Sequence, residues 1–158
     1  MLASEIIARY EAYCPQELSM EGDISGLQIG TLDKEVDKVL VALDIREQTV
    51  AEAIEAGAGL IIVKHAPIFH PLKDLVADKA QNQMILSLIK HDIAVYVSHT
   101  NIDVVEDGLN DWFCQLLDIE ETSFLSQTSP EHGIGRVGKI SPQTFGDFAA
   151  KVKATFGL

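Results

Sequence analysis

The chain has 158 residues, of which 47% are hydrophobic and 23% are charged, and its formal net charge is −12 at pH 7. This length and apolar content are typical of one globular domain, or one domain and part of a second, and they exclude a disordered chain. The acidic balance argues against nucleic acid as a partner, because an acidic surface repels phosphate groups.

The chain carries no sign of a membrane or secretory protein. No apolar run approaches the roughly 20 residues that a membrane helix needs. The first residues, MLASEIIARYEAY, lack the basic region of a signal peptide. Cys14 and Cys114 lie far apart without metal-type spacing, so we expect two buried, reduced thiols. A cytoplasmic protein is the expectation.

The first third of the chain predicts one helix and a turn-rich segment. Apolar residues at helical spacing predict an amphipathic helix over residues 3–13, which Pro15 ends. The segment EGDISGLQIG then carries three glycines within nine residues. Its spacing differs from the GxGxxG fingerprint, so we expect turns here and no phosphate-binding loop.

The middle of the chain alternates apolar runs with helical patterns. Strands are expected over residues 38–44, 60–63 and 93–97, with helices over 46–56 and 80–90 between them. This order predicts an α/β fold built on a right-handed βαβαβ unit, with a mainly parallel sheet flanked by helices. A further helix is expected over residues 108–117.

The amino-acid composition changes after Glu120. The stretch SQTSPEHGIGRVGK is rich in loop-forming residues, and Ser141 followed by Pro142 is typical of a helix N-cap. The last helix would then bury an apolar face. We therefore expect an N-terminal α/β metal-site domain at 1–125, and at 126–158 the truncated beginning of a second α/β region.

Two histidines stand directly after predicted parallel strands. His65 follows the strand at 60–63, and His99 follows the strand at 93–97, with Asp103 four residues later. Because the carboxyl ends of parallel strands share one edge, these residues could converge there. Imidazole and carboxylate suit zinc, iron, manganese or cobalt. A metal site and an ordinary buried or rim histidine both remain open for His65.

Two charged residues at the same predicted strand ends have two interpretations each. Lys64 is either a solvated strand-end lysine or a cation beside a bound phosphate. Asp44 either orients an imidazole from behind or caps the helix that follows it. No GxSxG motif is present, and neither cysteine has a base at motif spacing, so nucleophilic catalysis has no support.

The pieces SGLQIG, VLVALDI, LIIVKHAPIFHPLKDL, HDIAVYVSHTNID, GLNDWF and HGIGRVG occur in this order along nearly the whole chain. Together they resemble the Nif-three-like family, whose members are called GTP cyclohydrolase 1 type 2 homologues or dinuclear-metal-centre proteins. The resemblance implies a toroidal homohexamer with two divalent metals per subunit. Metal ligands in this family come from a His-His pair, an HTxxD motif, and a C-terminal His and Glu.

The resemblance assigns His65 and Asp103 as metal ligands, and it places His99 close to the metals. This chain departs from the pattern at Lys64, which replaces the first histidine of the pair and whose ammonium has no lone pair for a metal. One or two metals per subunit are therefore expected. The sequence ends at Leu158 and does not include the family's C-terminal His and Glu. We therefore expect a fragment that binds metal weakly.

Three functions follow as hypotheses. The first is a metal-dependent hydrolase that acts on GTP or a related small phosphate compound, with Lys64 steadying negative charge as a catalytic residue. The second is a non-catalytic metal-binding homo-oligomeric assembly or partner-binding protein, which the loss of a ligand at Lys64 favours. The third, nucleic-acid binding through a ring, is disfavoured by the acidic composition.

Overall fold

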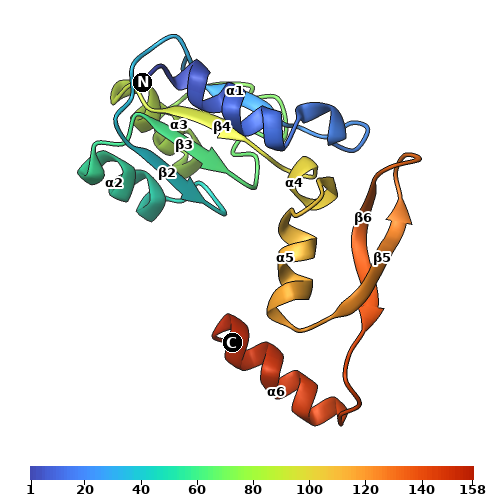
Figure 1. Cartoon of the computed structure of the whole chain (residues 1–158). Helices are drawn as coiled ribbons and strands as arrows, with labels where there is room; N and C mark the ends of the chain where they lie inside the picture. Colours follow the sequence, from blue (N-terminus) through green and yellow to red (C-terminus); the bar gives the residue numbers. More distant parts are fainter. The chain divides into compact units, whose positions relative to one another are not determined.

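The computed structural model describes every residue from Met1 to Leu158. The chain divides into two compact units, Met1–Asn101 and Ile102–Leu158 (Figure 1). The predicted division lay at residues 125 and 126. The division in the structure lies earlier, because the helix that follows residue 108 packs with the strands and the final helix of the second unit.

The first unit is built on a four-stranded sheet. Its strands are β1 (Gly26–Ile29), β2 (Val39–Ala42), β3 (Leu60–Val63) and β4 (Ala94–Val97), in the spatial order β1-β4-β3-β2. β2, β3 and β4 are parallel, and β1 is antiparallel to β4. The predicted α/β fold with a mainly parallel sheet is therefore confirmed.

Helices cover both faces of this sheet. The α-helices are α1 (Ala3–Tyr13), α2 (Glu47–Ala56) and α3 (Ala80–Lys90), and a short 3-10 helix, η1 (Gln16–Leu18), follows α1. All three α-helices were predicted to within one residue at each end. α2 ends at Gly57, whose left-handed φ of 67° is the usual helix-ending conformation of glycine.

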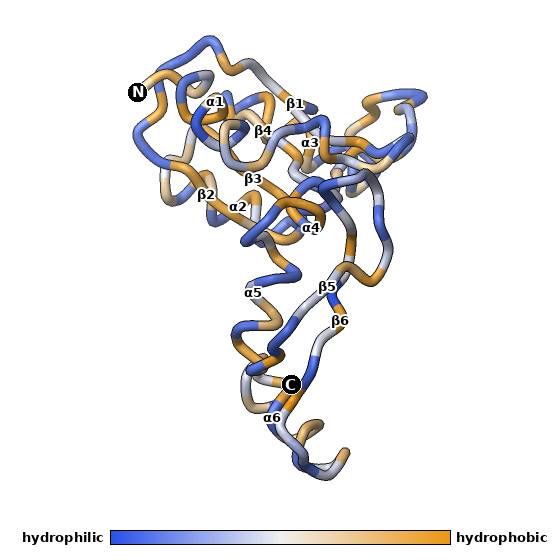
Figure 2. The backbone as a smooth tube through the Cα atoms, turned by 45° about the vertical axis from the view of Figure 1, so that its right-hand side comes forward, coloured by the Kyte–Doolittle hydropathy of each residue, from blue (hydrophilic) through white to orange (hydrophobic).

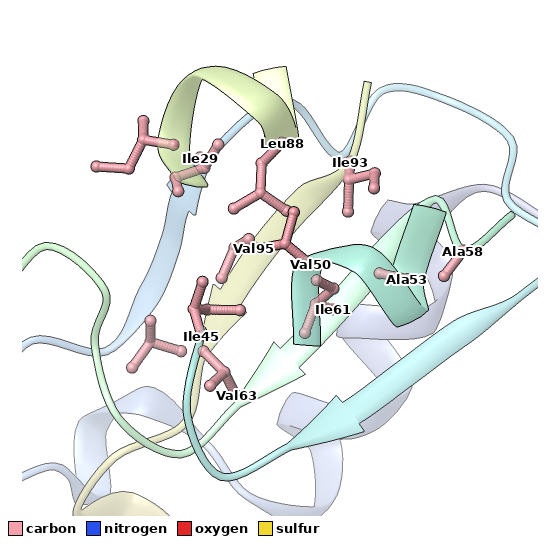
Figure 3. Packing of buried hydrophobic residues seen from close by; sticks show 12 residues of the cluster. Ile29, Ile45, Val50, Ala53, Ala58, Ile61, Val63, Leu88, Ile93 and Val95 are labelled. Carbon is pink, nitrogen blue, oxygen red and sulfur yellow. The ribbon is translucent and has the colours of Figure 1, made fainter. Parts of the chain in front are cut away.

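Two apolar clusters hold the sheet between its helices. In the first, Val50 and Ala53 of α2 and Leu88 of α3 lie over Ile61 and Val95 (Figure 3). The second cluster lies on the other face, because successive side chains of a strand point to opposite faces. It joins α1 to both inner strands through the buried residues Ala3, Ile7, Leu60, Ala94 and Tyr96. β4 is buried along its whole length, as an inner strand covered on both faces must be.

Part of the segment predicted as turns forms β1, and that prediction was wrong. The strand is only four residues long and begins at Gly26, whose φ of 101° disfavours other residues. Gly30, just after it, lies so close to β4 that a Cβ would come within 3.0 Å of the Ala94 Cα. β1 therefore forms through its pairing with β4, although its own sequence has little strand character.

The second unit consists of a hairpin and helices. α4 (Asn101–Val104) crosses the unit boundary, α5 (Leu109–Leu116) precedes the hairpin, and α6 (Phe145–Phe156) ends the chain. β5 (Glu120–Gln127) and β6 (Gly133–Lys139) pair antiparallel, so the loop predicted for residues 126–139 is instead largely strand (Figure 1). The glycines and serines of these strands give no alternation of apolar and polar side chains, so the sequence does not indicate a strand there. The pairing depends on main-chain hydrogen bonds.

Two polar contacts organise the second unit. Arg136 of β6 donates to both carboxylate oxygens of Asp111 in α5, at 2.5 and 2.8 Å, and its guanidinium lies 4.8 Å from the centre of the Phe124 ring. α6 begins after Thr144 and not after the predicted Ser141. The Thr144 hydroxyl accepts from the Asp147 main-chain N–H at 3.1 Å, a cap that Ser141 does not provide.

The hydropathy of the chain follows the fold of the first unit. The backbone at β2 and β3 is drawn in the hydrophobic colour (Figure 2), in keeping with the run of aliphatic residues in each strand. None of the helices has both the length and the apolar character required to cross a membrane.

Neighbouring residues on α3 provide a test of the packing. Leu88 is 0% exposed and its neighbour Ile89 is 52% exposed. We expect Leu88→Ala to lower the free energy of unfolding by about 2–5 kcal/mol, because it leaves a cavity in the core. Ile89→Ala, the matched control, should change it by less than about 0.5 kcal/mol. Urea unfolding followed by circular dichroism measures both, and equal effects would contradict this packing.

Candidate functional site

The ends of three parallel strands place three side chains in one row. Ala42 pairs with Val63, and Val63 pairs with Val97. Two residues beyond this row stand Asp44, His65 and His99. The edge of the sheet therefore presents a carboxylate and two imidazoles side by side. The ring centres of His65 and His99 are 5.9 Å apart, so the structure brings together the two histidines that the sequence singled out.

Asp44 holds the imidazole of His65. The Nδ1 atom of His65 and the Oδ1 atom of Asp44 are 2.7 Å apart, and Arg46 donates to the other carboxylate oxygen at the same distance. The hydrogen bond from His65, and then the guanidinium of Arg46, lower the pKa of Asp44. Asp44 therefore orients an imidazole, which was one of the two roles predicted for it.

Asp23 holds the imidazole of His99. Its Oδ1 atom lies 2.5 Å from Nδ1 of His99, and its Oδ2 atom accepts from the Thr100 main-chain N–H at 3.0 Å and from the Thr100 hydroxyl. Burial alone would raise the pKa of Asp23, but the hydrogen bonds from Thr100 and His99 outweigh it and lower the pKa to about 2. The carboxyl group is therefore ionised at neutral pH.

Asp23 was missed by the sequence analysis. It lies 76 residues from His99, in the glycine-rich segment before β1, and no spacing connects the two. The only signal available was a carboxylate in a segment that was expected to form turns. Its role becomes visible only when β1 is placed beside β4.

The two carboxylates fix how each imidazole carries its proton. An ionised carboxylate only accepts hydrogen bonds, so Nδ1 of His65 and Nδ1 of His99 must each donate. In a neutral imidazole held in this way, the lone pair lies on Nε2, the nitrogen that does not face the carboxylate. Metal-binding histidines are typically held in this way, with one nitrogen on a carboxylate and the other on the metal.

Lys64 connects the end of β3 to the end of β4. Its ammonium donates to the main-chain carbonyl of His99 at 2.8 Å. This bond joins the residue after β3 to the second residue after β4, and it fixes the position of the ammonium group.

A buried hydrogen-bond network joins the residues after β4 to α1 and to the residue after α1. The hydroxyl of Ser98 donates to Oδ1 of Asn101 at 3.0 Å and lies 2.5 Å from the hydroxyl of Tyr10. Asn101 in turn donates to the main-chain carbonyl of Cys14 at 3.2 Å. Both Ser98 and Asn101 are buried, so the segment that contains His99 is held in place by α1 and the residue after it.

Asp103, the other predicted ligand, lies beyond the boundary in the second unit. It belongs to α4, and its main-chain carbonyl accepts from the side chain of Asn110 at 2.8 Å. The structure contains no group of three or more His, Cys, Asp or Glu side chains arranged to hold a metal ion. The role of Asp103 as a ligand beside His65 and His99 therefore stays a prediction.

Comparisons with known sequences give a consistent result. The family model described as Duf34/NIF3 (NGG1p interacting factor 3) matches residues 1–158. A protein of Streptococcus pneumoniae named GTP cyclohydrolase 1 type 2 homolog is 70% identical over 158 residues, which cover 100% of this chain and 60% of that protein. A protein of Lactococcus lactis with the same name is 51% identical over the same shares. The chain thus spans about 60% of the length of these relatives.

Solved structures show the same fold. A Bacillus cereus protein related to NIF3 matches with a TM-score of 0.80 and 46% identity, over 82% of this chain and 36% of that one. Reduced HcgD from Methanocaldococcus jannaschii matches with a TM-score of 0.86 and 33% identity, over 98% of this chain and 60% of that one.

The support beneath β4 can be tested by removing one hydroxyl. Ser98→Ala would leave the buried Oδ1 of Asn101 without its donor, so we expect a loss of about 1–3 kcal/mol in the free energy of unfolding. Ser87→Ala on α3 is the control, and we expect a change below about 0.5 kcal/mol. Urea unfolding compares the two variants. A Ser98→Ala protein as stable as the control would contradict the network.

Proposed function

Because the chain belongs to the Duf34/NIF3 family, we propose that it binds a divalent metal ion at the carboxyl edge of β3 and β4. We propose further that the whole protein is a metal-dependent hydrolase of GTP or a related phosphate compound. One observation carries the metal site. His65 and His99 lie with their ring centres 5.9 Å apart, each with its Nδ1 atom on a carboxylate.

The side chains present fit a metal of the zinc, iron, manganese or cobalt type. His65 and His99 would provide two imidazole nitrogens, and the HTxxD motif assigns Asp103 as a third ligand. Two imidazoles and one carboxylate leave a coordination position open, as catalytic metal sites require. Lys64, whose ammonium has no lone pair, favours one metal per subunit over the two that the family resemblance implies.

The protein's own groups would have distinct tasks in such a hydrolase. A bound divalent metal supplies Lewis-acid chemistry toward a substrate oxygen. Asp44 and Asp23 keep the two imidazoles oriented, and the ammonium of Lys64 lies at the same edge, where it would counter the charge of a phosphate. The substrate class rests on the names of the relatives, which read GTP cyclohydrolase 1 type 2 homolog.

Self-association belongs to the same proposal. The family resemblance implies a toroidal homohexamer. Light scattering tests this by measuring the molar mass of the protein, extended to the full length of its relatives. Nucleic acid is not proposed as a partner, because the net charge of −12 opposes binding to phosphate backbones.

A second candidate is a metal-binding assembly protein without catalysis. The observation that favours it is Lys64, which stands where the family has a histidine and donates to the main-chain carbonyl of His99. A site that has exchanged a ligand for a main-chain contact can still hold a metal and stabilise an assembly. Turnover separates the two candidates.

Metal content gives the direct test of the site. We expect near-stoichiometric divalent metal per subunit in the protein at its relatives' full length, measured by elemental analysis. His65→Ala and Asp103→Ala should each reduce the metal to background, because each removes a proposed ligand. His91→Ala is the matched control, since His91 ends α3 and precedes β4, at the opposite end of that strand from His99. Metal retained in His65→Ala would refute the proposed site.

Turnover of GTP is the next measurement on the same metal-loaded protein. The hydrolase proposal expects product release that His65→Ala abolishes and that His91→Ala leaves unchanged. Stoichiometric metal without turnover of GTP or related phosphate compounds would favour the non-catalytic candidate.

A further inference from the structure

Asp23 is held more tightly than a surface ion pair. Its side chain is 6% exposed, whereas the side chain of Asp44, the carboxylate beside the other histidine, is 24% exposed. Both of its oxygens accept from main-chain N–H groups, Oδ1 from Ile24 at 2.8 Å and Oδ2 from Thr100 at 3.0 Å. Main-chain hydrogen bonds therefore fix the carboxylate independently of its contact with the imidazole.

We propose that Asp23 is the positioning residue of the strand-edge site, which holds His99 as the Nδ1–H tautomer with its Nε2 lone pair available to a ligand. The tautomer is a property of the metal-free protein. Its effect on metal binding rests on the proposed metal site. Asp23 acts through His99 and is not itself a ligand.

The direction of the hydrogen bond follows from the contacts of the carboxylate. Because a main-chain N–H donates to each oxygen, each oxygen must be an acceptor, and a proton on either would face another donor. The only hydrogen bond left for His99 at 2.5 Å is one in which Nδ1 donates.

Asp23 also fixes the direction of the ring. It binds the side chain of His99 and both the main chain and the hydroxyl of Thr100, the next residue. One carboxylate thus forms hydrogen bonds with two consecutive residues just after β4. The ring cannot turn about its side-chain bonds without losing the bond to Asp23.

His65 is held less firmly. Its side chain is 50% exposed, and its partner Asp44 shares its other oxygen with Arg46, whose side chain is 75% exposed. Exposed contacts of this kind contribute little and exchange with water. The site therefore combines one imidazole fixed in place, His99, with one that can adjust, His65.

The substitution Asp23→Ala makes the proposal testable, because it removes the carboxylate that accepts from Nδ1 of His99. An amide at this position would not decide the question. With its oxygen on the Thr100 N–H, its NH2 group would face the Ile24 N–H, and the opposite placement would set NH2 against the Thr100 N–H. Without the carboxylate, nothing at this position keeps the proton of His99 on Nδ1.

Long-range ¹H–¹⁵N NMR spectra of the metal-free protein report the tautomer directly. At one fixed pH of about 8.5, where histidines are neutral, wild-type His99 should show a protonated Nδ1 and an unprotonated Nε2. Asp23→Ala should lose this single pattern and show protonated Nε2. Thr100→Val removes the hydroxyl contacts to Asp23 and to the Met20 main-chain N–H but keeps the carboxylate beside His99, so as the matched control it should leave the tautomer unchanged. The spectrum of His99→Gln assigns the signals.

The outcomes separate this inference from the proposed metal site. A wild-type His99 protonated on Nε2 overturns the inference, and this measurement needs no variant to fold. An unchanged tautomer in folded Asp23→Ala overturns it as well. The expected loss of the Nδ1–H tautomer, together with zinc affinity weakened about 10–100-fold in Asp23→Ala, supports both proposals. That loss in a protein whose wild type binds no zinc supports the inference and refutes the metal site.

Discussion

The hydrogen bond between an ionised carboxylate and Nδ1 of a histidine is the constraint on which the candidate site depends. It occurs twice at one sheet edge, from Asp44 to His65 and from Asp23 to His99. In each pair the carboxylate decides which nitrogen keeps a lone pair. Without these bonds the histidines would be two imidazoles of undefined tautomer. With them, both rings are prepared as acceptors 5.9 Å apart.

The rest of the first unit serves to hold that edge. Apolar clusters on both faces fix the parallel strands, so the residues just beyond them have little freedom. Beneath β4, the hydroxyl of Ser98 and the amide of Asn101 join the strand end to α1 through buried hydrogen bonds. Buried networks of this kind are costly to leave half satisfied, which makes them rigid supports. Lys64 adds a direct tie between the two strand ends.

The sequence predicted what local pattern controls. Aliphatic runs and helical periodicity located α1 to α3 and the three parallel strands, and strand ends located His65, His99 and Asp44. It failed where pairing between distant segments decides the outcome. β1 begins at Gly26 and forms only against β4, and β5 and β6 form from serine- and glycine-rich residues. Asp23 was missed for the same reason, because its partner His99 is distant in the chain.

The in-register row of strand ends has a consequence for folding accuracy. A slip of one residue between β3 and β4 would set Lys64 or Ala66 beside His99, and it would turn the apolar side chains of the slipped strand toward the wrong face. The paired imidazoles therefore exist only in the correctly aligned sheet. Any ligand that needs both rings would bind the aligned sheet and not its misaligned competitors. It would thereby stabilise the native register by mass action.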